Sequence, residues 1–218
     1  MSGPLWQPDP AAVRRTALYR VMREVEQITD LPMISTADFH DFSISSPGDF
    51  WDLVWGECGV IGDRGEGAAV LPPPPGHDLR STRFFPAATL NYAENLLAGG
   101  EVPGAQDTAL VFRREDGVRR VWSWSELRGA VAAVRAALTE AGVGVGDVVA
   151  AWMPNTPETV IVMLAAQSLG AVFTSTSPDF GPSGVLDRFG QVAPKVLVAA
   201  DGYVYGGKNH DRTDALAQ

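Results

Sequence analysis

Residues 148–199 read VVAAWMPNTPETVIVMLAAQSLGAVFTSTSPDFGPSGVLDRFGQVAPKVLVA, in which short apolar runs alternate with segments of helical character. The apolar runs lie at Val148–Met153, Ala171–Thr174 and Lys195–Ala199, and the helical segments lie at Glu158–Leu169 and Pro182–Val192. None of the apolar runs alternates with polar residues, which is typical of strands that are buried on both faces. Strands and helices in this order predict an α/β fold with a βαβαβ unit and a parallel sheet.

A β-hairpin is predicted before this unit, within an α/β part that we expect to cover residues 81–218. Two β-rich runs, Ala109–Arg113 and Val118–Trp124, are joined by Glu-Asp-Gly, a typical hairpin turn. The capping-box pattern Ser-x-x-Glu then opens an alanine-rich helix that runs to Ala141. A short helix is also predicted at Asn91–Ala98, ended by Gly99-Gly100.

Residues 1–80 are predicted to form an N-terminal helical and aromatic appendage. Apolar residues at four-residue steps predict one amphipathic helix over Ala12–Thr29. Aromatic residues crowd into residues 36–56, where Ser46-Pro47 marks a helix start, and they favour a docking segment over a ligand site. Residues 62–80 are rich in Gly and Pro, which predicts an extended crossing over the surface.

The overall composition argues against several classes of partner. With 17 basic and 26 acidic side chains, the net charge is -9, so neither nucleic acid nor an anionic membrane is the expected partner. Any anion site must therefore be local. The single cysteine, Cys58, forms no internal disulfide and fits a cytoplasmic location. No signal peptide pattern and no membrane-spanning apolar run is recognised in the sequence.

Three predicted loops leave the carboxyl ends of the parallel strands, where ligands bind in sheets of this kind. They are Pro154–Pro157, Ser175–Pro182 and Ala200–His210. Small residues let a ligand approach the backbone closely, and prolines fix a loop's shape in advance. The middle loop fits two interpretations equally: a ligand site, or a tight strand-to-helix turn with Pro182 at the first helical position.

The last of these loops contains a possible phosphate-binding motif. Residues 202–208, GYVYGGK, spell G-x-x-x-x-G-K after a predicted strand, as in P-loop nucleotidases. The position that should provide a Ser or Thr for magnesium is Asn209, and no apolar helical stripe follows. The histidines and Cys58 have no partners at the spacing of metal ligands or catalytic pairs. We therefore predict no metal site and no catalytic residue, and keep the P-loop nucleotidase only as an alternative.

The order of these landmarks resembles the N-terminal part of the adenylate-forming acyl-CoA synthetases. The resemblance runs through residues 121–173, from VWSWSELRG to GAVF, and through KVLVAADG at 195–202. More narrowly, FFPAATLNYAENLL, TSTSPDFG and ADGYVYGGK resemble the acetoacetyl-CoA synthetase branch. The resemblance covers nearly the whole chain from about Phe39 onward, and it implies that residues 81–218 are an incomplete AMP-binding domain.

This resemblance implies a two-step ligase reaction. A carboxylate attacks ATP to give an acyl-adenylate and pyrophosphate, and the CoA thiol then displaces AMP. Since full members are far longer than 218 residues, the chain would be the N-terminal segment of an acetoacetate–CoA ligase. It would be inactive alone and would need the C-terminal portion of its own enzyme. Acetoacetate, ATP and CoA are the implied small-molecule partners, with Mg²⁺ expected for the full-length enzyme.

The resemblance also implies where CoA binds. The channel for the pantetheine arm would be lined by Ser177, Pro178, Asp179, Phe180 and Gly181. The phosphates at the nucleotide end of CoA would meet Tyr205, Gly206, Gly207 and Lys208. Related acetyl-CoA enzymes tend to carry two arginines in this last loop, whereas the chain keeps one cation there, a lysine without a bidentate grip. The alternative from another class is a stand-alone module that binds CoA or another phosphorylated ligand without chemistry.

Overall fold

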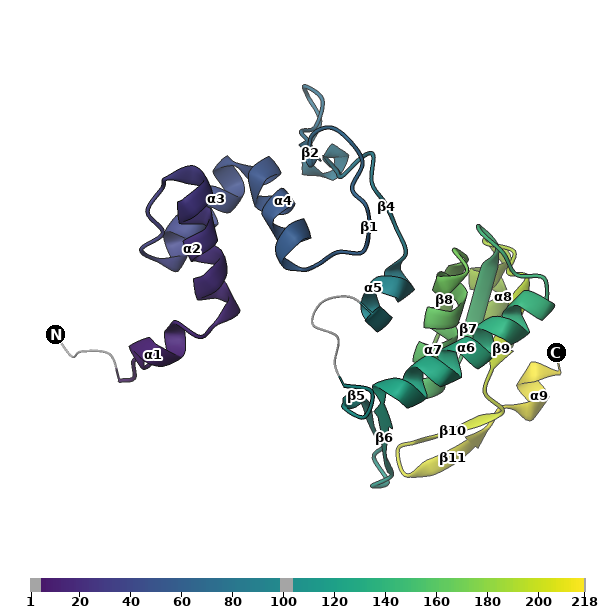
Figure 1. Ribbon diagram of the computed structural model, residues 1–218. Helices are drawn as coiled ribbons and strands as arrows, with labels where there is room; N and C mark the ends of the chain where they lie inside the picture. Colours follow the sequence, from purple (N-terminus) through teal and green to yellow (C-terminus); the bar gives the residue numbers. More distant parts are fainter. Residues whose placement is uncertain (1–4, 99–103, 218) are drawn as a thin grey trace. The chain divides into compact units, whose positions relative to one another are not determined.

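The protein is described by a computed structural model, which places residues 5–98 and 104–217. The chain divides into two compact units, residues 1–89 and 90–218 (Figure 1). A domain boundary after residue 80 stays a prediction. Among the described residues, no helix combines the length and the apolar character needed to cross a membrane.

The first unit is mainly helical. Its helices are α1 (Pro10–Val13), α2 (Ala17–Thr29), α3 (Thr36–Ser45) and α4 (Pro47–Glu57), with a 3-10 turn at Leu79–Ser81. Its short strands are β1 (Gly62–Asp63), β2 (Val70–Leu71) and β3 (Arg83–Phe84), and β4 (Thr89–Leu90) lies at the boundary between the units. The strands β2 and β3 pair antiparallel, and the Gly- and Pro-rich crossing of residues 62–80 contains the two short strands β1 and β2.

The single helix predicted over Ala12–Thr29 is wrong at its N-terminal end. Two helices occupy this range: α1 ends at Val13, and Thr16 caps the start of α2, its hydroxyl accepting a hydrogen bond from the Tyr19 N–H at 3.2 Å. The predicted helix start at Ser46-Pro47 is confirmed. Phe50 packs edge-to-face against Phe39, with 5.7 Å between ring centroids, so the aromatic cluster forms part of this unit's core.

The second unit contains the predicted βαβαβ arrangement. A short helix and a hairpin come first: α5 (Tyr92–Ala98), β5 (Thr108–Arg113) and β6 (Arg119–Ser123). They are followed by α6 (Trp124–Glu140), β7 (Val148–Trp152), α7 (Pro157–Ser168), β8 (Val172–Thr176), α8 (Pro182–Gly190) and β9 (Val196–Ala199). The unit ends with β10 (Gly202–Tyr205), β11 (Lys208–Asp211) and α9 (Thr213–Leu216). The predicted helix stop at Gly99-Gly100 lies outside the described residues.

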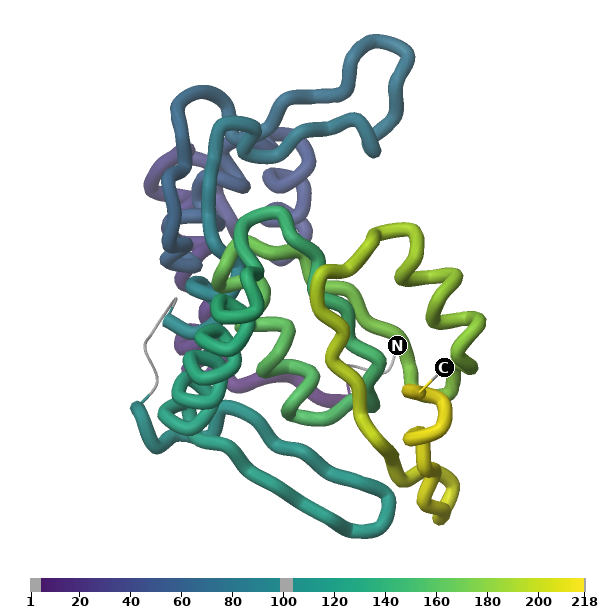
Figure 2. The backbone as a smooth tube through the Cα atoms, turned by 90° about the vertical axis from the view of Figure 1, so that its right-hand side faces the viewer, coloured from purple at the N-terminus to yellow at the C-terminus, as the bar shows by residue number. Residues whose placement is uncertain are grey.

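The three-stranded sheet has the order β8-β7-β9, and β7 pairs parallel with both neighbours. Helices cover both faces, with α6 and α7 on one side and α8 on the other (Figure 2). Successive residues of the central strand β7 pack on opposite faces of the sheet. Val149 packs with the α6 and α7 side chains, whereas Ala150 and Trp152 pack with Val185 and Phe189 of α8. This double burial explains why the strand lacks polar alternation.

Candidate functional site

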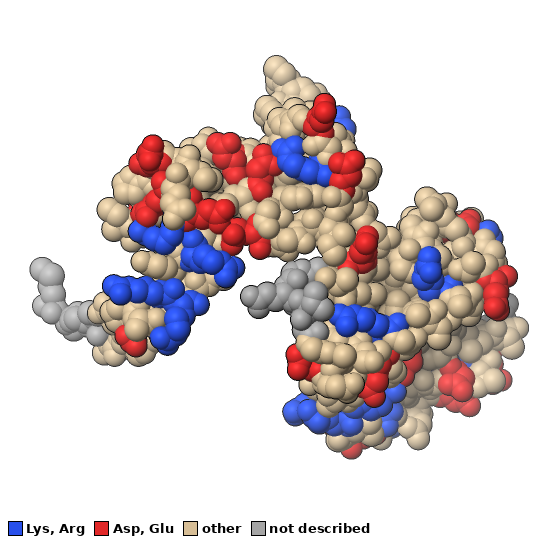
Figure 3. Space-filling model, viewed as in Figure 1, with Lys and Arg blue, Asp and Glu red and all other residues tan. Residues whose placement is uncertain are grey.

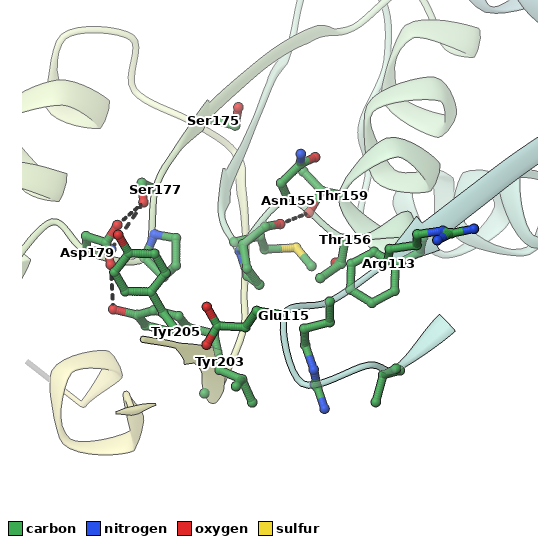
Figure 4. Close-up of a pocket in the computed structure, with 18 of the residues that line it drawn as sticks. Arg113, Glu115, Asn155, Thr156, Thr159, Ser175, Ser177, Asp179, Tyr203 and Tyr205 are labelled. Atoms are coloured by element: carbon green, nitrogen blue, oxygen red, sulfur yellow. Dashed lines mark hydrogen bonds between the residues drawn. The ribbon is translucent and has the colours of Figure 1, made fainter. Parts of the chain in front are cut away.

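The carboxyl ends of β7, β8 and β9 lie at the same edge of the sheet, as parallel strands require. A cleft of about 870 Å³ opens there (Figure 4). It is lined by the loop after β7, the loop after β8, the β5–β6 hairpin and strand β10. The loops that follow the first two strands therefore reach the cleft at the edge that the sequence indicated.

The loop after β8, residues 177–181, forms a compact turn. The Phe180 N–H donates to the Ser177 carbonyl oxygen at 3.3 Å, with Pro178 at the second position of the turn. The Ser177 hydroxyl donates to the Asp179 carboxylate at 2.8 Å. Helix α8 then begins at Pro182, whose missing N–H is no loss at the first helical position. The loop is thus fixed by local hydrogen bonds, by Pro178 within it and by Pro182 at the start of the helix that follows.

Two side chains outside the loop, Trp152 and Arg212, hold its backbone in place. The buried Trp152 indole N–H donates to the Ser177 carbonyl at 3.2 Å. The Arg212 guanidinium donates to the Phe180 carbonyl at 2.8 Å and lies over the Trp152 ring, 4.9 Å from its centroid. Since two carbonyls of the loop are held from two different elements, we expect the loop to keep its shape when a ligand approaches.

No contact within the chain explains why residue 181 of this loop is a glycine. Its φ is -70°, an ordinary value for any residue, and a side-chain carbon at this position would meet nothing within 4 Å. Neither backbone strain nor a close contact inside the protein requires glycine here. Gly181 is exposed, and the space beside it is open to solvent, as it is beside many glycines of the chain.

Residues 200–211, predicted as a loop up to His210, instead contain the hairpin of β10 and β11. Tyr205 pairs with Lys208, and the two-residue turn is formed by Gly206 at φ 61° and Gly207 at φ 72°. Positive φ at both turn residues is the type I′ geometry that glycine favours. The predicted loop is therefore wrong, because Lys208 begins a strand. A P-loop needs a helix at this point, so the P-loop alternative lacks its geometry.

A tyrosine–aspartate hydrogen bond ties this hairpin to the loop after β8. The Tyr203 hydroxyl donates to Asp179 at 2.6 Å, and the Tyr203 ring stacks on His210 with 4.8 Å between centroids. The hydrogen bonds from Tyr203 and then from Ser177 lower the pKa of Asp179, because they stabilise its charged form. The same Asp179 bond raises the pKa of Tyr203. The two predicted parts of the CoA site are thus physically connected.

The structure brings only some of the predicted site residues to the cleft. Those that line it are Ser177, Pro178, Asp179 and Tyr205. Those that lie outside its lining are Phe180, Gly181, Gly206, Gly207 and Lys208. The Phe180 ring packs under the Arg188 guanidinium, 4.2 Å from the ring centroid, and Lys208 is exposed beside the hairpin turn. Four of the nine predicted residues therefore contribute to one wall of the cleft, and the other five lie outside its lining.

The β5–β6 hairpin provides the opposite wall, which was not predicted from the sequence. This wall consists of Phe112, Arg113, Arg114, Glu115, Val118 and Arg120. Figure 3 shows basic side chains gathered over this hairpin, although the net charge of the protein is -9. Arg120 makes a bidentate pair with Glu158 at 2.6 and 3.0 Å, which lowers the pKa of that carboxyl. The dense run of arginines is the sequence signal that could have identified this wall.

Comparisons with known proteins agree with this architecture. Residues 101–217 match the family model described as "AMP-binding enzyme". The chain is 47% identical to acetoacetyl-coenzyme A synthetase of Rhizobium meliloti (strain 1021) over 95% of the chain, and 35% identical to acetoacetyl-CoA synthetase of Macaca fascicularis over 98%. The solved acetoacetyl-CoA synthetase from Streptomyces lividans matches 99% of the chain at 36% identity, with a TM-score of 0.82. The chain spans 31% of each of these two curated relatives and 33% of the solved chain.

Proposed function

Because the chain belongs to the AMP-binding enzyme family, we propose that it is the N-terminal segment of an AMP-forming ligase that converts acetoacetate, ATP and CoA to acetoacetyl-CoA. The observation that carries this proposal is the extent of the similarity. The family model covers residues 101–217, whereas the similarity to acetoacetyl-CoA synthetases extends over 95–99% of the chain and so includes the helical first unit. That unit favours this branch over the wider family.

Within this proposal, the segment provides the scaffold and part of the CoA site. The fit to CoA rests on two features of the chain: the open space at Gly181, and a glycine turn followed by an exposed lysine. The loop of residues 177–181 would lie along the pantetheine arm, its backbone held by Trp152 and Arg212. CoA would supply the thiol that takes the acyl group, and the chain's own residues would bind and orient it.

The phosphates at the nucleotide end of CoA would bind at the tip of the β10–β11 hairpin. The backbone N–H groups of a type I′ turn point away from the strands, and the turn glycines carry no side chain to cover them. Lys208 forms no ion pair within the described part of the chain, so its ammonium can serve as a point charge for phosphate. Local positive charge of this kind is what an acidic protein needs for an anionic ligand.

The residues that would bind ATP and Mg²⁺ are not assigned to this chain. Among the described residues, no group of three His, Cys, Asp or Glu side chains could hold a metal ion. Adenylation needs groups that stabilise charge on the transferring phosphoryl group, and we propose that the rest of the enzyme provides them. A cytoplasmic location, suggested by the single cysteine, also remains a prediction.

Kinetics of acetoacetyl-CoA formation test this function. In the full-length enzyme, Lys208→Ala should raise the KM for CoA about tenfold, which corresponds to about 1.4 kcal/mol, because one phosphate contact is lost. The KM for acetoacetate should not change. Arg135→Ala is the matched control, since it removes an equal charge from an exposed position on α6. CoA binding without formation of acetoacetyl-CoA would instead favour the binding-module alternative.

A further inference from the structure

Two hairpin turns that lie 92 residues apart in the sequence meet beside the cleft. The Glu115 carboxylate, in the turn of the β5–β6 hairpin, accepts a hydrogen bond from the Gly207 N–H at 2.7 Å. Figure 4 shows the Glu115 side chain reaching from its own hairpin toward Tyr203 and Tyr205. A short bond from a backbone N–H to a carboxylate is charge-assisted, and its geometry is that of an anion bound to a turn.

The Gly206-Gly207 turn has the properties of a small anion site. Both residues have positive φ, and a side-chain carbon at either position would meet nothing within 4 Å, so the turn is open to solvent. Lys208 follows directly and is exposed. The Glu115 carboxylate occupies this site as an acceptor of the same kind as a phosphate oxygen.

Glu115 is held in place neither by burial nor by an ion pair, although the neighbouring Arg114 attracts it electrostatically. Its side chain is exposed, and within the described part of the chain it forms no ion pair. The neighbouring Arg114 pairs with Asp116 at 2.6 Å instead. The bond to Gly207 is therefore the interaction that positions the carboxylate, and an anion that binds the turn better can displace it.

We propose that Glu115 occupies the phosphate-binding turn of the β10–β11 hairpin and must leave it before a phosphate of CoA binds there. This inference rests on the proposed function, since it concerns the same turn. The carboxylate lowers the affinity for CoA in two ways. It competes for the Gly207 N–H, and its negative charge repels the incoming phosphate. Glu115 thus sets the affinity of the site without touching the reacting atoms.

Calorimetric titration of CoA into the full-length enzyme tests this role. Glu115→Gln removes the charge and should tighten CoA binding about fivefold at low salt, a change of about 1 kcal/mol. The gain should shrink at high salt, because an exposed charge is screened. Glu140→Gln, at an exposed position at the end of α6, is the matched control and should leave the affinity unchanged. Equal or weaker CoA binding by Glu115→Gln would overturn the inference.

A second readout separates this inference from the proposed function. In protein without CoA, the NMR signal of the Gly207 amide should shift on Glu115→Ala, because its acceptor is lost, and an unchanged signal would overturn the inference. CoA is also titrated into the Lys208→Ala variant of the full-length enzyme. If Lys208→Ala weakens CoA binding while Glu115→Gln does not strengthen it, the inference fails and the proposed site stands. If Lys208→Ala has no effect, the proposed placement of the phosphates itself is wrong.

Discussion

Replacing Gly207 by alanine is expected to destabilise the β10–β11 hairpin by about 1–2 kcal/mol, the cost of placing an L-residue in the left-handed region. The value follows from the φ of 72° at this position. No steric clash adds to this cost, because a side-chain carbon at position 207 would meet nothing within 4 Å. Hydrogen exchange of the amide protons of β10 and β11 should therefore quicken about five- to thirtyfold, at 1.4 kcal/mol per factor of ten.

The neighbouring turn residue provides the control for this experiment. Gly206→Asn should leave exchange in the hairpin nearly unchanged, since Asn tolerates positive φ and Asn-Gly is the preferred type I′ pair. Gly206→Ala should be as costly as Gly207→Ala, because Gly206 has a φ of 61°. If the alanine variants exchange at the rate of the unmodified protein, or if Gly206→Asn is equally costly, then the turn is not type I′.

The other predictions concern the loop of residues 177–181. Gly181→Ala should change the free energy of unfolding by less than about 0.5 kcal/mol yet raise the KM for CoA, whereas Gly129→Ala should leave that KM unchanged. If Gly181→Ala destabilises the folded protein but leaves the KM for CoA unchanged, then the glycine is needed for folding and not for CoA binding. Folding lowers the pKa of Asp179, so the ionised carboxylate stabilises the folded state. This stabilisation is fully present above the usual pKa of 3.8 and is lost as the pH falls through the lower pKa of the folded protein. Denaturation at a series of pH values should show this loss, and Asp179→Asn should remove it; an unaltered pH profile in that variant would contradict the argument.

The α/β core could be predicted from the sequence because its signals are local. Unbroken apolar runs mark β7, β8 and β9, and a proline marks the start of α7 and of α8. Strand β8 continues to Thr176, two residues beyond the predicted end, because Thr176 still pairs with Trp152 of β7. Thr176 favours a strand, but Ser175 and the Ser177-Pro178 pair that follows are typical of a turn, so this end is set by pairing with the neighbouring strand.

The candidate site was only partly predictable, because its contacts join distant parts of the chain. Strand β11 reads KNHD, which has no apolar alternation, and its hairpin is tied to the body through Tyr203 and Asp179. The bond between Glu115 and Gly207 spans 92 residues, so no local pattern indicates it. The loop after β8, in contrast, has its own signature of proline, serine and glycine, and it lies where that signature placed it.

The exchange of pyrophosphate into ATP measures the first half-reaction and tests the central claim most directly. We expect the full-length enzyme to catalyse exchange that depends on acetoacetate, and residues 1–218 alone to catalyse none. Acetate at the same concentration is the control substrate and should support much less exchange. Exchange by the 218-residue chain alone, or a full-length enzyme that does not respond to acetoacetate, would contradict the account.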